Sequence, residues 1–241
     1  MSKLFLVVCL VLFGSFAQAE TFFTEYKTKV LEASDTQVVI ADSPSFIVGA
    51  SGIVSHTFDA KTKSIIARVD VVQKDGTKAI LKISKFDMLA QGAFPDTGIK
   101  PSTGDDVVIN YLYDRALIVV PNQAVFNQVT KEYKGITWVH PDILAAYLAK
   151  LYRPNPDKKV LQQMCYQNAA SVIFFGIDGK GSFVDCHNFN ILQTIKIPSG
   201  GENELPFYSR ISKHIDSSWF TWDSSKIGDY TTYYSNLIYT K

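Results

Sequence analysis

The hydrophobic pattern of the chain changes near Tyr113, and this change most constrains the fold. Before it, apolar and polar residues alternate strictly, as in "ARVDVV" at 67–72, which is typical of half-buried antiparallel strands. After it, "ALIVVP" at 116–121 is continuously apolar, like a strand covered on both faces. The sequence therefore predicts an α+β chain, with a β-rich unit over 20–113 and an α/β unit over 114–241.

The first unit contains several short strands separated by turn residues. Asp75 and Gly76, in "KDGT", are the strongest hairpin signal in the chain. The run "FIVG" at 46–49 is interpreted as one more short strand. We expect a small antiparallel β-barrel-like unit.

The second unit alternates strand and helix patterns. Asn122 is the expected N-cap of a helix that stops at Gly135, and Pro141 opens the next helix. A third helix, "DKKVLQQMCYQNA", leads into the strands "SVIFFGI", "SFVDC" and "ILQTIKI". This order predicts an α/β layer whose sheet ends in an antiparallel hairpin.

The last 35 residues, 207–241, are rich in aromatic side chains, which disordered segments lack. We therefore expect this segment to pack back onto the body of the protein. Its final helix should present one apolar face, made of Ile227, Tyr230, Tyr234, Leu237 and Ile238.

The first nineteen residues have the pattern of a secretory signal peptide. Lys3 precedes an apolar run from Leu4 to Phe13, and an A-x-A cleavage site ends at Ala19. The apolar run is too short to span a membrane, and no longer one follows. The expected product is an exported protein that starts at Glu20 and has no transmembrane segment.

The charge balance argues against a nucleic-acid ligand. The full chain has 24 basic and 23 acidic residues, and removal of 1–19 takes away Lys3, leaving 24 − 1 = 23 of each. A neutral protein lacks the basic footprint on which nucleic-acid affinity depends.

Two cysteines remain after cleavage, Cys165 and Cys186. In an oxidising compartment they can form a disulfide, which would stabilise the fold by roughly 3 kcal/mol on the chain-entropy model. Two buried free thiols are the alternative, and the sequence leaves both open.

The strongest catalytic candidate is "DCHN", Asp185 to Asn188, with His140 and Asp142 available from elsewhere. A nucleophilic cysteine needs a base within hydrogen-bond reach, whereas neighbours on a strand point to opposite faces. A Cys/His hydrolase is therefore the least favoured interpretation. The run "GIDGKGS" at 176–182 resembles a phosphate-binding loop, but it leads into a strand pattern and is interpreted as a hairpin turn.

No cofactor or metal site is expected. The histidines are isolated, at positions 56, 140, 187 and 214, without the spacing of paired ligands. The aromatic run from Trp219 to Trp222 is interpreted as core rather than as a binding platform.

Three runs of the chain stand out together: "GDDVVINYLYDRALIVVPN" (104–122), "WVHPDILAAYLAKLYRPNP" (138–156) and "IFFGIDGKGSFVDCHNFNIL" (173–192). With "VGASGIVSHTFD" near the N-terminus, they resemble the N-terminal domain family of bacterial plasminogen-binding proteins from Gram-negative envelopes. The resemblance covers nearly all of the chain after the signal peptide.

This resemblance implies a non-enzymatic protein of the cell surface or outer membrane that binds host plasminogen through its lysine-recognising kringle sites. The preferred ligand of such sites is a C-terminal lysine, whose ammonium and carboxylate are a fixed distance apart, so Lys241 is the expected partner-binding residue. A periplasmic envelope assembly or scaffold module is the alternative. The sequence does not indicate an oligomeric state.

Overall fold

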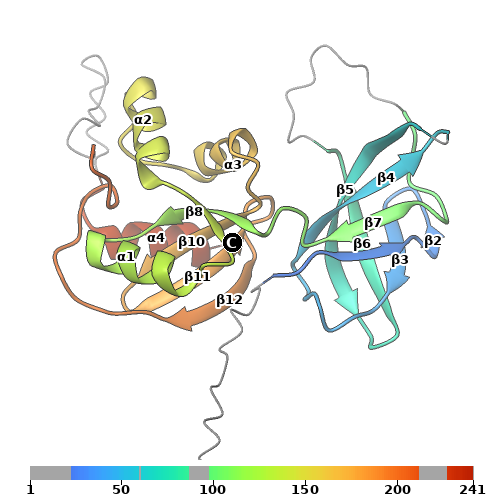
Figure 1. The fold of residues 1–241 in the computed structure, drawn as a ribbon, viewed down its shortest axis with the longest axis horizontal. Coiled ribbons are helices and arrows are strands. Elements are labelled where there is room, and N and C mark those ends of the chain that lie inside the picture. Colours follow the sequence, from blue (N-terminus) through green and yellow to red (C-terminus); the bar gives the residue numbers. More distant parts are fainter. Residues whose placement is uncertain (1–22, 60, 87–97, 212–226, 241) are drawn as a thin grey trace, which may run out of the picture.

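The computed structural model describes residues 23–59, 61–86, 98–211 and 227–240, and shows an α+β protein built on two sheets (Figure 1). The expected signal peptide lies outside these residues. The first sheet contains β1 (Tyr26–Lys29), β2 (Glu32–Ala33), β3 (Gln37–Ala41), β4 (Ser51–Thr57), β5 (Lys63–Lys74), β6 (Lys78–Ser84) and β7 (Asp106–Ile109). The second contains β8 (Arg115–Val119), β9 (Thr137–Val139), β10 (Val172–Ile177), β11 (Lys180–Asp185) and β12 (Ile191–Lys196). The helices are α1 (Gln123–Glu132), α2 (Pro141–Leu151), α3 (Lys158–Gln167) and α4 (Tyr230–Tyr239).

The first sheet is antiparallel, has the order β1-β7-β4-β5-β6-β3-β2, and curls until its edges meet. The connection between β1 and β2 joins the edges. Val30 donates its N–H to the carbonyl of Asp105 at 2.9 Å, and Leu31 donates to Val39 of β3 at 2.8 Å. This closure leaves few free backbone groups on the first sheet.

The hairpin predicted at Asp75 and Gly76 is confirmed between β5 and β6. The Asp75 carboxylate accepts hydrogen bonds from the backbone of Thr77 and Lys78, at 2.8 and 2.7 Å. Gly76 has φ +90°, a conformation that residues with a Cβ rarely adopt.

The strand predicted at 46–49 is wrong, because this segment is a loop. The carbonyl of Phe46, and that of Ser43 just before the segment, accept from a side chain instead of from a neighbouring strand. Lys74 Nζ donates to the carbonyls of Ser43 and Phe46, at 2.7 and 2.5 Å, and lies 4.3 Å from the centre of the Phe46 ring. Phe46 is buried in the core although it belongs to no strand, which explains why an apolar residue stands in this loop.

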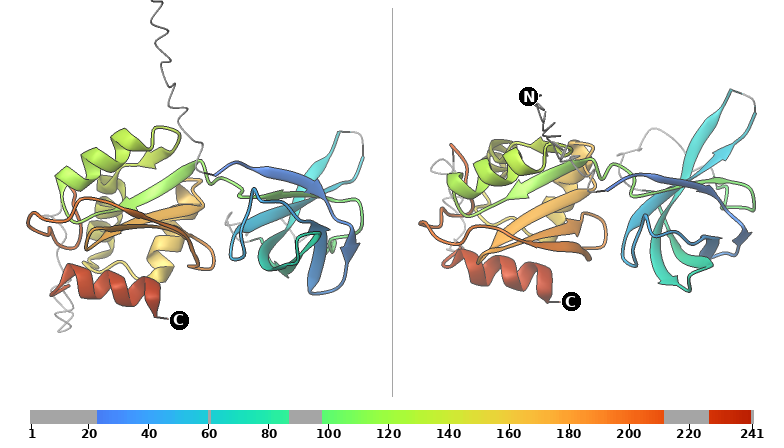
Figure 2. Two further views of the ribbon diagram at one scale, coloured as in Figure 1. Left: turned by 90° about the horizontal axis from the view of Figure 1, so that it is seen from below. Right: turned by 60° about the horizontal axis from the view of Figure 1, so that its bottom comes forward.

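The second sheet has the order β12-β11-β10-β8-β9, with β10, β8 and β9 parallel and the β11 and β12 edge antiparallel. Successive β8 residues alternate between two layers. Ala116 and Ile118 belong to the apolar cluster that includes α1, and Leu117 belongs to the cluster that includes α2, α3 and α4. Figure 2 shows α1 and α4 on opposite sides of this sheet.

The expected helix starts are observed. Asn122 accepts the Val125 N–H at 3.1 Å as the N-cap of α1, and Pro141 is the first residue of α2. The final helix is also present, and three residues of its expected apolar face, Tyr230, Tyr234 and Ile238, are buried against the second sheet.

The chain passes from the first sheet to the second between Ile109 and Arg115. One apolar cluster nevertheless continues from the interior of the first sheet, through Tyr113, to the α1 face of the second. The division into a β-rich unit that ends at 113 and an α/β unit that begins at 114 therefore stays a prediction. Within the described ranges, no helix has both the length and the apolar character needed to cross a membrane.

Candidate functional site

The C-terminal lysine singled out by the sequence, Lys241, lies outside the described residues. The preceding residue, Thr240, is exposed, and its carbonyl accepts a hydrogen bond from Lys158 Nζ at 3.4 Å. Because α4 packs against the sheet through Tyr230, Tyr234 and Ile238, this end of the described chain is anchored to the body and still open to solvent.

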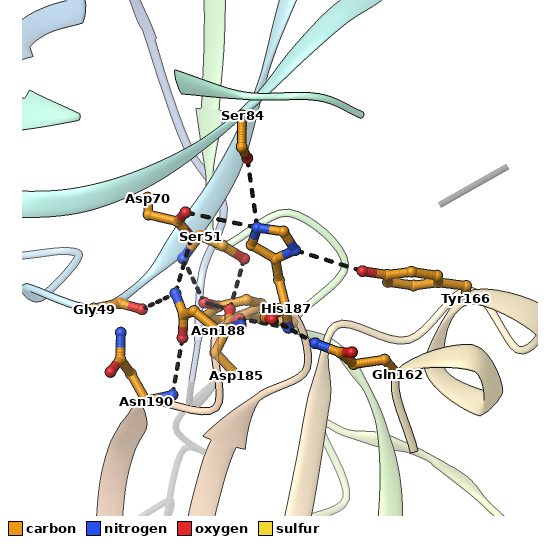
Figure 3. A network of polar contacts seen from close by, with 11 residues as sticks. Gly49, Ser51, Asp70, Ser84, Gln162, Tyr166, Asp185, His187, Asn188 and Asn190 are labelled. Carbon is orange, nitrogen blue, oxygen red and sulfur yellow. Dashed lines mark hydrogen bonds and ion pairs between the residues drawn. The ribbon is translucent and has the colours of Figure 1, made fainter. Parts of the chain in front are cut away.

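The "DCHN" segment lies where the two sheets meet (Figure 3). Asp185, the last residue of β11, has no exposed surface. Its Oδ2 accepts hydrogen bonds from Ser51 Oγ at 2.6 Å and from the Tyr113 hydroxyl at 2.5 Å. Ser51 is the first residue of β4, so this one carboxylate joins the first sheet, the connecting segment and the second sheet.

The other oxygen of Asp185 orders the turn that follows β11. Oδ1 accepts the backbone N–H groups of His187 at 2.7 Å and of Asn188 at 3.0 Å. Burial, followed by the negative charge of Asp185, raises the pKa of Tyr113 well above its usual value. The phenol therefore stays protonated and keeps donating to the carboxylate.

The ordered turn makes a second set of contacts with the first sheet. Asn188 Nδ2 donates to the carbonyl of Gly49 at 3.0 Å and to Asp70 Oδ1, on β5, at 2.8 Å. His187 Nε2 lies 3.6 Å from Asp70 Oδ2 and 3.4 Å from Ser84 Oγ. Burial raises the pKa of Asp70, although His187 and Asn188 oppose that shift.

Helix α3 holds the turn from the opposite side. Gln162 Nε2 donates to the carbonyl of His187 at 2.7 Å, and the Tyr166 hydroxyl lies 3.5 Å from His187 Nδ1. Cys165 and Cys186 form a disulfide, with an S–S distance of 1.99 Å and a Cα–Cα distance of 6.4 Å, and both are buried. Covalent and polar contacts thus hold one turn between α3 and the first sheet.

The arrangement contains the residue types of a serine hydrolase but not their geometry. In a working triad the carboxylate binds one imidazole nitrogen and the serine binds the other. Here both Asp70 and Ser84 approach Nε2 of His187. Cys186 is in a disulfide and so is no free thiolate, and the residues after Asp185 form a turn rather than the strand assumed from the sequence.

The remaining candidates have local structural partners. His140 caps α2 through its Nδ1, which accepts the N–H of Asp142 at 3.2 Å, and Asp142 binds Arg210 at 2.6 Å. The run at 176–182 forms the β10–β11 hairpin, as predicted. In the ranges that the structure covers, no group of three or more His, Cys, Asp and Glu side chains could hold a metal. His214 and the run Trp219–Trp222 lie outside those ranges.

Sequence reasoning missed Ser51, Tyr113, Asp70 and Arg68 as parts of the junction. Arg68 is 2% exposed, its Nε has no hydrogen-bond partner, and its guanidinium carbon lies 5.5 Å from the centre of the Tyr166 ring. The available signal is polarity inside strand patterns, since Arg68 and Asp70 occupy alternate positions of a strand whose intervening residues are apolar.

Comparison with known proteins identifies a family that the chain matches. The family described as "Plasminogen-binding protein pgbA N-terminal" matches residues 25–238. Two curated relatives, each the plasminogen-binding protein PgbA of a Helicobacter pylori strain, are 22% identical over 176 residues. The aligned region covers 71% of this chain and 38% of each relative. The chain therefore spans well under half of the length of the curated relatives it matches.

Proposed function

The chain belongs to the plasminogen-binding protein pgbA N-terminal family, and from that premise we propose that it is an exported, non-enzymatic surface protein that binds host plasminogen through lysine-dependent recognition. The observation that carries the proposal is the extent of the family match, which includes residues of both sheets and nearly all of α4. The residues of the "DCHN" turn, which resembled a catalytic group in the sequence, join the two sheets. This structural role supports the hypothesis of a non-enzymatic binding protein.

The proposed contact is Lys241 in a kringle lysine-binding site of plasminogen. A terminal lysine offers an ammonium and a carboxylate together, so a groove with oppositely charged ends and aromatic walls can hold both. The exposed position of Thr240, just after a helix that packs against the second sheet, supports this choice, because the described chain ends at an anchored and accessible point.

An internal lysine must borrow its carboxylate from a neighbour. The pair Lys100–Asp35, with Nζ and Oδ1 2.8 Å apart, is an exposed example, since its side chains are 69% and 82% accessible. Both charges are already engaged with each other in water, so we expect such a pair to contribute weakly.

The test is surface plasmon resonance with immobilised plasminogen. The wild-type chain, a Lys241 deletion and Lys100→Gln are compared, with 6-aminohexanoate as competitor. Deletion leaves a terminal carboxylate on Thr240 but removes its matched cation. We expect a loss of about 2 kcal/mol, or ~30-fold in Kd, for the deletion, and little change for Lys100→Gln.

Equal binding by the wild type and the deletion would move the contact to an internal lysine. Binding that 6-aminohexanoate does not reduce would remove lysine dependence from the proposal.

A second candidate function, an envelope assembly or scaffold module, is favoured by one observation. The matched region covers only 38% of each relative, so the binding property in their name could reside in the remainder. Protease treatment of intact cells separates the two functions. Loss of this chain on shaving supports host binding, whereas protection until the outer membrane is opened supports the envelope module.

A further inference from the structure

Strand β12 forms an open edge of the second sheet. It pairs with β11 alone, whereas the first sheet closes on itself. An edge strand presents unpaired backbone groups that can bind another extended chain. Among the described residues, no strand lies on the outer side of β12.

The register identifies which backbone groups are free. Ile197 donates its N–H to the carbonyl of Gly179 at 3.0 Å, which fixes this opposed pair as a hydrogen-bonded one. Since hydrogen-bonded and non-bonded pairs alternate in antiparallel strands, Lys196 and Thr194 belong to non-bonded pairs. The N–H and C=O groups of Thr194 and Lys196 therefore point away from β11.

The β11 and β12 edge carries two opposed positive charges. Lys180 and Lys196 lie directly opposite each other in the register, and both are exposed. Like charges in this position repel. Neither lysine has an ion-pair partner in the described part of the chain. A carboxylate on a third strand, beside Lys196, would relieve the repulsion.

A cleft with both polar and apolar residues in its lining lies at the other end of β12. Its volume is about 200 Å³, and Leu192 and Gln193 of β12 line it together with Phe46 and Ile47 of the first sheet's loop and with Tyr113. Ile47 is 42% exposed, although it is a large aliphatic residue. The cleft has room for one aromatic or branched side chain from a strand residue opposite Gln193.

We propose that β12 is a docking edge for an extended, acidic segment of a partner protein, which adds to the second sheet as a sixth strand. The segment runs antiparallel to β12. It places a carboxylate beside Lys196, exchanges main-chain hydrogen bonds with Thr194 and Lys196, and inserts an apolar side chain into the cleft. This surface is independent of Lys241 and of plasminogen binding.

The same features argue against a second copy of this chain as the occupant. The sequence of β12, "ILQTIK", contains no acidic residue, so a copy could not neutralise Lys196. A lysine on an edge strand also discourages indiscriminate pairing with apolar strands. It thereby selects an acidic segment over other extended chains.

The test uses a fluorescein-labelled, acetylated peptide, Ser-Glu-Val-Thr-Phe-Val-Ser amide, and the full chain. In the proposed register its Glu lies opposite Lys196 and its Thr opposite Thr194. Its Phe lies opposite Gln193, on the face of β12 that lines the cleft. We expect saturable binding by fluorescence anisotropy. A peptide with Lys in place of Glu, and a peptide methylated at the threonine amide nitrogen, should each bind at least tenfold more weakly.

Protein variants provide the matched control. Lys196→Glu should weaken binding of the Glu peptide at least tenfold and restore binding of the Lys peptide. Lys61→Glu, which changes an exposed lysine in the turn between β4 and β5, should leave both unchanged. Thr194→Pro removes the outward N–H on an edge where proline is tolerated, and should abolish binding while the circular dichroism spectrum stays native.

Three outcomes would overturn the proposal. The first is no binding of the Glu peptide at millimolar concentration. The second is equal binding of the Glu, Lys and N-methylated peptides. The third is a dimer in sedimentation velocity that Thr194→Pro dissociates, which would assign the edge to a second copy.

Discussion

Replacement of Asp185 by asparagine tests the central contact between the sheets. The side chain keeps its size, but one carboxylate oxygen becomes an NH2 group that cannot accept. At present the carboxylate accepts from Ser51 Oγ, the Tyr113 hydroxyl and two backbone N–H groups, with no exposed surface. The amide oxygen can still accept the two backbone bonds, so the amide nitrogen must face the two hydroxyls.

The expected cost follows from these four bonds. A hydrogen bond to a charged group contributes roughly 1.5–3 kcal/mol and a neutral one about 0.5–1.5 kcal/mol, so each retained bond loses about 1 kcal/mol. Each of the two hydroxyls, of Ser51 and Tyr113, that loses its acceptor adds about 1 kcal/mol to the loss of folding free energy. With two weakened backbone bonds and two hydroxyls without an acceptor, we expect Asp185→Asn to lower the free energy of unfolding by about 4 kcal/mol, which corresponds to ~8–16 °C in Tm for a domain of this size.

The assay is urea and thermal unfolding followed by far-UV circular dichroism. The matched control is Asp178→Asn, in the exposed β10–β11 turn, where φ is +45° and asparagine is well tolerated. The control should stay within about 0.5 kcal/mol of wild type. If Asp185→Asn also stays within about 1 kcal/mol of wild type, the carboxylate does not hold the sheets together and the argument from its four bonds is refuted.

Three further predictions concern single contacts. Cys165→Ser/Cys186→Ser, which opens a disulfide with a sequence separation of 21, should lose about 3 kcal/mol in urea unfolding, and thiol titration of the unreduced wild type should detect neither cysteine. Burial opposes ionisation of Asp142, but hydrogen bonds from Arg210 and Ser209 hold its pKa below the usual value. The ionised carboxylate therefore stabilises the folded protein above about pH 4, and this stabilisation is lost as the pH falls through the lowered pKa. The stability difference between wild type and Asp142→Asn should therefore shrink over that range, and a constant difference would contradict the assignment. Asp229→Ala removes the N-cap that accepts the Thr232 N–H at 2.7 Å and should cost about 1 kcal/mol, whereas an unchanged Tm would show that α4 is held by packing alone.

Local patterns predicted most of the elements because their causes are local. The turn at Asp75 and Gly76, the cap at Asn122 and the apolar face of α4 each depend on residues a few positions apart. The strand expected at 46–49 failed because Phe46 alone of its apolar side chains is buried, while Lys74, 28 residues from Phe46, binds the Phe46 carbonyl.

The junction could not be predicted in this way. Asp185 is 134 residues from Ser51 and 72 from Tyr113, so the network exists only after both sheets have formed. In the sequence, the residues of "DCHN" suggested chemistry because a thiol, an imidazole and a carboxylate are adjacent. In the structure, the disulfide and the buried hydrogen bonds use the same groups to hold a turn.

The central functional claim, lysine-dependent binding of plasminogen, is tested most directly on one preparation of the protein. Binding to immobilised plasminogen is measured before and after carboxypeptidase B treatment, with mass spectrometry to verify that one lysine has been removed. We expect the treated protein to lose most of the signal that 6-aminohexanoate can compete, while its circular dichroism spectrum is unchanged. The absence of any competable binding before treatment would contradict it.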